Sequence, residues 1–196
     1  MTRAHDMSRG QTPSQTVGPF FKPSLIHAGS ETLATASTRG ERIIVAGRVL
    51  DGDGAAVNDA MIEIWQANAD GRYDHPDDQQ EKRIDPNFRG FGRAATDEEG
   101  RFRFVTIVPG AVAGSGGVAQ APHINVSIFA RGLLKRLVTR IYFPGEPLNA
   151  ADSLLASVPA ARRPTLIARA ERSGPVREFI FDIILQGGNE TVFLDI

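Results

Sequence analysis

Cysteine is absent from the 196 residues of this chain. This absence excludes disulfide bonds, thiolate metal ligands and a cysteine nucleophile, and it fits a reducing compartment such as the cytoplasm. No run of about eighteen uncharged apolar residues occurs, which is the minimum for a membrane-spanning helix. Residues 1–21 also lack the basic head and apolar stretch of a signal peptide. We therefore expect a soluble, cytoplasmic protein.

The chain also has no excess of positive charge, because it contains 22 Lys and Arg residues and 23 Asp and Glu residues. A formal net charge of -1 gives no summed field that would hold nucleic acid or an anionic membrane, so neither is expected as a partner. The length is enough for one domain with an arm, and such a chain buries roughly two-thirds of its unfolded surface.

The organisation of the chain changes near residue 40. Residues 1–40 show no sustained apolar period and are rich in Ser, Thr, Gly and Pro, so they are predicted to form an extended N-terminal arm and interface segment. Phe20 and Phe21 lie side by side in this arm, and we expect them to dock on this chain or another. Residues 41–196 are predicted to form the folded domain.

Short runs of β-branched and aromatic residues, separated by Gly, Asn and Asp, predict an all-β fold for that domain. The expected architecture is a β-sandwich of mixed short strands with one short helix inside residues 150–173. Along residues 178–186, the alternation of apolar and polar positions indicates a strand buried on one face. The expected strands are residues 42–50, 60–66, 101–107, 124–130, 137–143, 178–186 and 191–196.

Histidine and tyrosine are scarce, with four and two residues. His5, His27 and His75 fall in polar segments and are expected at the surface. His123 and Asn125 share one face of a strand, about 6 to 7 Å apart. Because Asn is a poor ligand for iron, zinc or copper, the residues alone favour a hydrogen-bonded pair over a metal site.

Several motifs, in order along the chain, carry a resemblance to a known family. They are residues 47–54, 62–73, 91–97, 106–110 and 122–124. Together they resemble the intradiol ring-cleaving dioxygenases over nearly the whole chain, from Pro13 to Ile196.

The resemblance implies a site for a non-haem Fe(III) ion held by two tyrosines and two histidines. Tyr73 and His123 stand at two of these positions, but Val112 and Asn125 occupy the other two. Two remaining ligands cannot hold Fe(III) tightly, because this hard ion needs anionic oxygen donors in a closed polyhedron. We therefore expect these four residues to form a vestigial site, no metal in this chain and no activity of the isolated chain.

The resemblance is strongest to metal-free α chains, which implies a hetero-oligomer with an iron-bearing β chain. The assembled enzyme would cleave 3,4-dihydroxybenzoate with O2 to 3-carboxy-cis,cis-muconate, a step of the β-ketoadipate pathway. The resemblance places Thr16, Pro19 and Arg131 in the wall of the substrate cavity at the interface. A guanidinium offers a planar fork of donors to the substrate carboxylate, which suits Arg131. Arg131 lies roughly 26 Å along the strand from His123, so it cannot line the vestigial site.

Other side chains on the neighbouring strand receive structural roles. Arg136 and Arg140 are expected on a solvated face, and Tyr142 is expected to pack. Two rival interpretations stay open. The chain could bind iron through an altered ligand set and act on a catechol alone, or it could be a non-catalytic, transthyretin-like β-sandwich used as a binding module.

Overall fold

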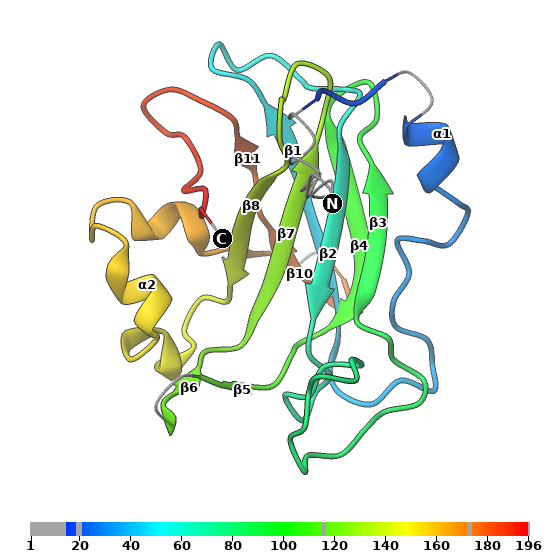
Figure 1. Cartoon of the computed structure of the whole chain (residues 1–196), viewed down its shortest axis with the longest axis vertical. Coiled ribbons are helices and arrows are strands. Elements are labelled where there is room, and N and C mark those ends of the chain that lie inside the picture. The colour runs from blue at the N-terminus through cyan, green and yellow to red at the C-terminus, as the bar shows by residue number, and fades with distance from the viewer. Residues whose placement is uncertain (1–14, 19–20, 115–116, 172–173, 196) are drawn as a thin grey trace, which may run out of the picture.

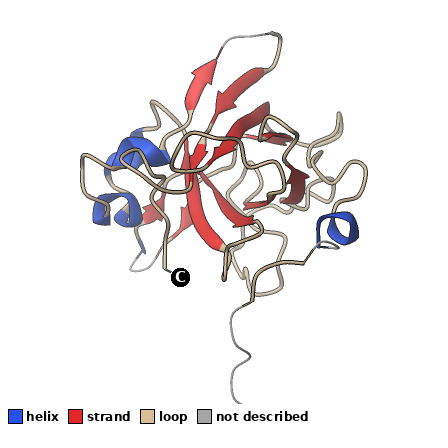
Figure 2. Ribbon diagram, turned by 90° about the horizontal axis from the view of Figure 1, so that it is seen from above, coloured by secondary structure: helices blue, strands red, loops and turns tan. Residues whose placement is uncertain are grey.

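Two β-sheets packed face to face make up most of the computed structural model, which describes residues 15–18, 21–114, 117–171 and 174–195. Figure 1 shows the two layers of strands, and Figure 2 shows short helices at opposite sides of them. The prediction of an all-β sandwich is confirmed. Within the described part of the chain, no helix is long and apolar enough to cross a membrane.

The first sheet is centred on β1 (Arg42–Leu50). β4 (Arg101–Ile107) pairs antiparallel with one edge of β1, and β10 (Arg177–Ile180) and β11 (Ile183–Ile184) pair parallel with successive parts of the other edge. β9 (Arg169–Glu171) extends the sheet beyond β10. The predicted strand at residues 178–186 is therefore divided into two.

The division occurs where residues 181–182 approach the middle of β1. Phe181 donates its N–H to the carbonyl of Ala46 at 2.8 Å, and Asp182 turns its carboxylate onto the N–H of Arg48 at 3.0 Å. A Cβ atom on Gly47 would lie only 1.9 Å from the carbonyl oxygen of Phe181. Glycine is therefore required where the two chain segments approach each other.

The second sheet is fully antiparallel, in the order β3, β2, β7 and β8. Its strands are β2 (Met61–Gln66), β3 (Phe91–Ala95), β7 (His123–Phe129) and β8 (Leu137–Tyr142). A small ribbon of β5 (Val112–Ala113) and β6 (Ala119–Gln120) precedes β7. Since side chains alternate along a strand, one face of this sheet points to the core and the other points outward.

The core lies between the two sheets and is built from alternate positions of their strands. Burial of large apolar side chains stabilises the fold by about 1.5 to 3 kcal/mol for each of them. The members with no more than 1% exposure include Ile43, Val45, Val49, Ile62, Ile64, Phe104, Ile124, Val126, Ile128 and Ile183.

A short helix lies inside residues 150–173 as expected, but the rest of that segment is not α-helical. The segment contains the end of a 3-10 turn η2 (Pro147–Ala150), the five-residue helix α2 (Ser153–Ser157), a second 3-10 turn η3 (Arg163–Leu166) and β9. Pro159 and Pro164 cannot donate the N–H groups that a continuous helix requires. The short helix is instead capped by Asp152, whose carboxylate accepts from the N–H of Leu155.

Two further sequence predictions differ from the structure. Residues 191–195 run beside the second sheet without forming a strand, although Leu194 donates its N–H to the carbonyl of Val138 at 2.7 Å. Strand β3 was not expected, because its small residues Gly92, Ala94 and Ala95 give little hydrophobic alternation.

Part of the N-terminal segment packs onto the sandwich. A five-residue helix, α1 (Phe21–Leu25), places the ring of Phe21 5.4 Å from that of Phe129. Leu33 and Ala34 are buried in the main core, and the N–H of Leu33 donates to Val105 at 2.8 Å. The proposed boundary between arm and domain at residue 40 stays a prediction. Residues 1–14, with His5, and residues 19–20 lie outside the described residues.

Candidate functional site

The candidate site lies on the outward face of the second sheet, where a row of side chains crosses four strands. The register pairs Phe91 of β3 with Trp65 of β2, Trp65 with Asn125 of β7, and Asn125 with Arg140 of β8. Neighbouring strands are about 4.8 Å apart, so these side chains stand close together. His123 lies two residues before Asn125 on the same face.

Tyr73 reaches this face from the long loop between β2 and β3. The carboxamide oxygen of Asn68 accepts from the N–H groups of Asp70 at 2.9 Å and Arg72 at 3.0 Å, which closes a tight turn. Gly71 has a φ of +79° inside that turn, and a Cβ there would lie 1.9 Å from the carbonyl oxygen of Ala111. The chain then presents Tyr73 toward β7.

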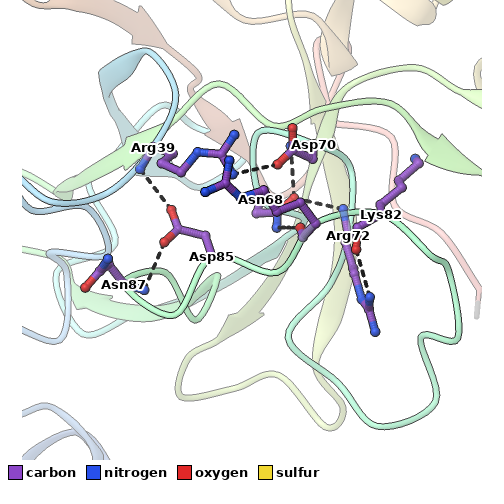
Figure 3. A network of polar contacts seen from close by, with 8 residues as sticks. Arg39, Asn68, Asp70, Arg72, Lys82, Asp85 and Asn87 are labelled. Atoms are coloured by element: carbon purple, nitrogen blue, oxygen red, sulfur yellow. Dashed lines mark hydrogen bonds and ion pairs between the residues drawn. The ribbon is translucent and has the colours of Figure 1, made fainter.

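A wider polar network fixes the same loop (Figure 3). Asp85 accepts from the N–H groups of Arg39 and Asn87, both at 2.9 Å, and the guanidinium of Arg39 contacts Asp70 at 3.1 Å. The N–H of Tyr73 itself donates to Asp78 at 2.8 Å. The loop is therefore held mainly by hydrogen bonds, and these determine the position of Tyr73.

Four side chains on this face form one continuous hydrogen-bonded chain. Nδ1 of His123 lies 2.7 Å from the carbonyl of Ala121, and Nε2 of His123 lies 3.3 Å from the hydroxyl of Tyr73. Asn125 donates through Nδ2 to the Tyr73 hydroxyl at 3.1 Å, and Arg140 donates through Nε to Oδ1 of Asn125 at 2.8 Å.

The direction of each hydrogen bond follows from its ends. A carbonyl can only accept, so the ring proton of His123 lies on Nδ1 and Nε2 is an acceptor. The hydroxyl of Tyr73 then donates to Nε2, and it accepts from Asn125 in turn. Arg140 can only donate, which agrees with its position at the other end.

His123 and Tyr73 have the protonation states that the hydrogen-bonded chain requires. Burial lowers the pKa of His123 from 6.5 to about 4, and the positive charge of Arg140 adds to this effect. Burial also raises the pKa of Tyr73, although Asn125 and Arg140 oppose this shift. Both residues are therefore neutral at pH 7, His123 as imidazole and Tyr73 as phenol.

Tyr142 and Asp152 hold the His123 end of the hydrogen-bonded chain in place. Asp152 is fully buried and accepts from the hydroxyl of Tyr142 at 3.0 Å and from the N–H of Ala121 at 2.9 Å. The carbonyl of Ala121 in turn accepts a hydrogen bond from Nδ1 of His123. Tyr142 packs in a small cluster with Leu155, Val158 and Leu166, in agreement with the expected packing role.

A cavity of about 1130 Å³ opens over this face. It brings together the four positions of the predicted vestigial site, Tyr73, Val112, His123 and Asn125. Residues that sequence reasoning did not assign to it also line it, among them Trp65, Gln120 and Arg140. Arg140 was expected on a solvated face, but it is half-buried and donates to Asn125 and to Gln120 at 2.8 and 2.7 Å. The register of β8 against β7 is the signal that would have found it.

These residues do not fit a ferric ion. Of the four positions, His123 alone is an imidazole, and its Nε2 accepts from Tyr73, while the apolar Val112 offers no donor atom. The guanidinium of Arg140 adds a positive charge beside the same atoms, which opposes a second cation. Among the described residues, no group of three or more His, Cys, Asp or Glu side chains is arranged to hold a metal.

Two of the other predicted site residues, Thr16 and Arg131, lie at the opposite end of β7. The N–H of Gly132 donates to the hydroxyl oxygen of Thr16 at 2.9 Å, so the arm passes next to Arg131. Arg131 forms an ion pair with Asp59, and its side chain is 70% exposed. This ion pair raises the pKa of Arg131 further. Pro19 lies outside the described residues. The assignment of these residues to a substrate cavity stays a prediction.

Comparison with known proteins agrees with this architecture. Residues 17–187 match the model of a protein family described as "Dioxygenase". The chain belongs to this dioxygenase family.

Individual relatives show which members of the family this chain is similar to. The chain is 41% identical over 200 residues to the protocatechuate 3,4-dioxygenase alpha chain of Burkholderia cepacia, covering 95% of this chain and 98% of that protein. It is 48% identical over 158 residues to the beta chain from the same organism, covering 78% and 67%. The solved dioxygenase domain of a carbohydrate-binding fusion protein from Streptomyces sp. SirexAA-E superimposes with a TM-score of 0.64 at 32% identity, covering 91% of this chain and 100% of that domain.

Proposed function

We propose that this chain is the metal-free α subunit of a protocatechuate 3,4-dioxygenase and that it acts together with an iron-bearing β chain. The observation that carries the proposal is the hydrogen-bonded chain from Arg140 to His123, which uses the donor atoms that a metal would need. Fe(III) in the partner would supply the activation of the catechol toward O2. This chain would contribute fold, interface and part of the cavity wall.

The α assignment is supported by the share of each chain that the match covers, and not by the percentage of identical residues. Identity to a β chain is higher, at 48%, but it covers only 78% of this chain. The match to an α chain covers 95% of this chain and 98% of that protein. Val112 and Asn125, in place of a tyrosine and a histidine, weigh against the β assignment because neither is a good ligand for Fe(III).

We further propose that Thr16, Pro19 and Arg131 contact the substrate at the interface between the subunits. The hydrogen bond from Gly132 to Thr16 supports this, since it brings the arm next to Arg131. The ion pair of Arg131 with Asp59 is largely exposed, so it contributes little and can be exchanged for a substrate carboxylate.

Co-expression tests the proposal. The full chain is purified alone and with a β chain of this family, and iron content and O2 uptake on 3,4-dihydroxybenzoate are measured for both. We expect a stable complex whose activity depends on the β chain, and an isolated chain without bound iron. Iron-dependent activity of the isolated chain would contradict the proposal. Failure to form a complex with any β chain would favour the alternative of a transthyretin-like binding module.

The role of Arg131 is tested in the active complex. Arg131→Ala should raise KM for 3,4-dihydroxybenzoate by about tenfold or more, because a charge-assisted hydrogen bond to the carboxylate is lost, while iron content is retained. Asp59→Asn is the matched control, since it removes the same ion pair but leaves the guanidinium in place. An unchanged KM in Arg131→Ala, or an equal rise in both variants, would refute carboxylate recognition by Arg131.

A further inference from the structure

The cavity on the outward face of the second sheet has a use that requires no metal ion. We propose that it binds a small aromatic carboxylate, with the carboxylate at Arg140 and the ring against Trp65. This inference goes beyond the proposed function and does not depend on it, because it concerns only residues of this chain.

Arg140 is held in a fixed orientation without a direct counter-ion. Its Nε and Nη1 atoms donate to the neutral amides of Asn125 and Gln120, at 2.8 and 2.7 Å. Its positive charge also acts on the hydroxyl of Tyr142, which itself donates to the carboxylate of Asp152 at 3.0 Å. Among the ion pairs of the described residues, none includes Arg140. A fixed, half-buried guanidinium of this kind favours an anion in the space above it.

Aromatic side chains form the adjoining wall of the cavity. Trp65 is 39% exposed, and its ring lies 4.7 Å from the ring of Tyr73 and 5.8 Å from that of His75. Phe91, next to Trp65 across the sheet, is 47% exposed. Partly exposed rings that line a cavity provide apolar area for a planar ligand, and offset or edge contacts between rings add to that area.

The spacing of the two features sets the size of the ligand. Asn125 separates Trp65 from Arg140 in the cross-strand row, so two strand spacings, roughly 10 Å, lie between their backbones. Tyr73 and Asn125 lie between them, so the ligand is expected in the cavity above these two side chains, where a single ring with one carboxylate substituent reaches from Trp65 toward Arg140.

The charges around the cavity agree with a monoanion. Arg136 and Arg89 line it and are exposed. Four carboxylates also line it. Asp74 and Asp77 belong to the exposed loop that follows Tyr73, where Asp77 lies 3.7 Å from His75, and the other two are engaged within the protein. Glu63 accepts from Arg93 at 2.7 Å, and Asp78 accepts from the N–H of Tyr73 at 2.8 Å. The anion is therefore expected on the β8 side, at Arg140.

The position of Trp65 provides the assay, because it is the only tryptophan in the chain. The full chain, purified without added iron, is titrated with 4-hydroxybenzoate while tryptophan fluorescence and heat are recorded. We expect saturable binding with a change in fluorescence. Phenol, which lacks the carboxylate, and acetate, which lacks the ring, should each bind at least about tenfold more weakly. Equal binding of phenol, or no saturable binding of 4-hydroxybenzoate, would overturn the proposal without affecting the proposed function.

Substitutions then locate the site. Arg140→Gln should weaken binding of 4-hydroxybenzoate by at least about tenfold, and Arg140→Lys, which keeps the charge, should restore part of it. Arg103→Gln, an exposed arginine on β4 of the first sheet, is the matched control and should bind as the wild type does. Circular dichroism establishes that each variant is folded. Should Arg140→Gln fail to fold, the ligand comparison and Arg140→Lys still decide the question. Wild-type affinity in folded Arg140→Gln would refute the role of Arg140.

Discussion

The buried imidazole of His123 should make the stability of the chain depend on pH. Its pKa is about 4 in the folded protein, against 6.5 for an unperturbed histidine. Burial is the main cause, and the positive charge of Arg140 adds to it, while the Ala121 carbonyl and Asp152 oppose the shift. Tyr73 and Tyr142 also face this ring, as neutral phenols.

The sign of the effect follows from the protons bound by each state. Between pH 4 and 6.5, the unfolded chain protonates His123 and the folded chain does not. Stability therefore rises with pH across this window, is complete above 6.5, and is lost as the pH falls. The difference between 6.5 and about 4 corresponds to about 3 kcal/mol in total. Between pH 7.5 and pH 5, the share already lost is about 2 kcal/mol.

Urea unfolding of the full chain at pH 7.5 and pH 5 measures how much stability is lost between these two pH values. Other ionisable groups contribute to the wild type and to His123→Asn alike, so the difference between the two proteins isolates His123. We expect the wild type to lose about 2 kcal/mol more than His123→Asn on acidification. His75→Asn is the matched control, because His75 is exposed. If His123→Asn shows the same loss of stability as the wild type, the imidazole is not held neutral by its surroundings and the reasoning fails.

Two further substitutions test the site and the fold. Tyr73→Phe removes the hydroxyl between His123 and Asn125. It leaves the buried Nε2 of His123 without a donor, whereas Nδ2 of Asn125 keeps its 3.3 Å hydrogen bond to the carbonyl of Trp65. The free energy of unfolding should therefore fall by about 1 to 3 kcal/mol, and no change in urea unfolding would contradict the hydrogen-bonded chain. Gly47→Ala places a Cβ 1.9 Å from the carbonyl of Phe181, and a loss of more than about 2 kcal/mol is expected. A melting temperature equal to that of the wild type would show that β1 and residue 181 do not approach so closely.

Much of the sandwich could be predicted from local alternation, because each long strand buries large side chains on one face. The bounds of β1 and β4 agree with the predicted residues 42–50 and 101–107. The prediction fails where burial is not local. β3 alternates small residues that carry no hydrophobic signal, and the division between β10 and β11 depends on the approach of Gly47, which is remote in sequence.

The candidate site could be predicted only in part for the same reason. Period-two geometry is enough to pair His123 with Asn125 on one face. Tyr73 lies 50 residues before His123, so its place came from the family resemblance and not from periodicity. Arg140 was missed because its proximity to Asn125 depends on the register of β7 against β8, which no single strand reveals.

The hydrogen-bonded chain also explains why Tyr73 and His123 can remain without a metal ion. His123 is 3% exposed, and its Nε2 would be an unsatisfied buried acceptor if the hydroxyl of Tyr73 were absent. Asn125 supplies the donor that the hydroxyl of Tyr73 accepts, and Arg140 satisfies the oxygen of Asn125. The amide at position 125 offers both a donor and an acceptor, and it therefore links the phenol oxygen of Tyr73 to the guanidinium of Arg140. The same four side chains are thus satisfied by one another, and the positive charge at the end of their chain is the feature of this face that remains available to a ligand.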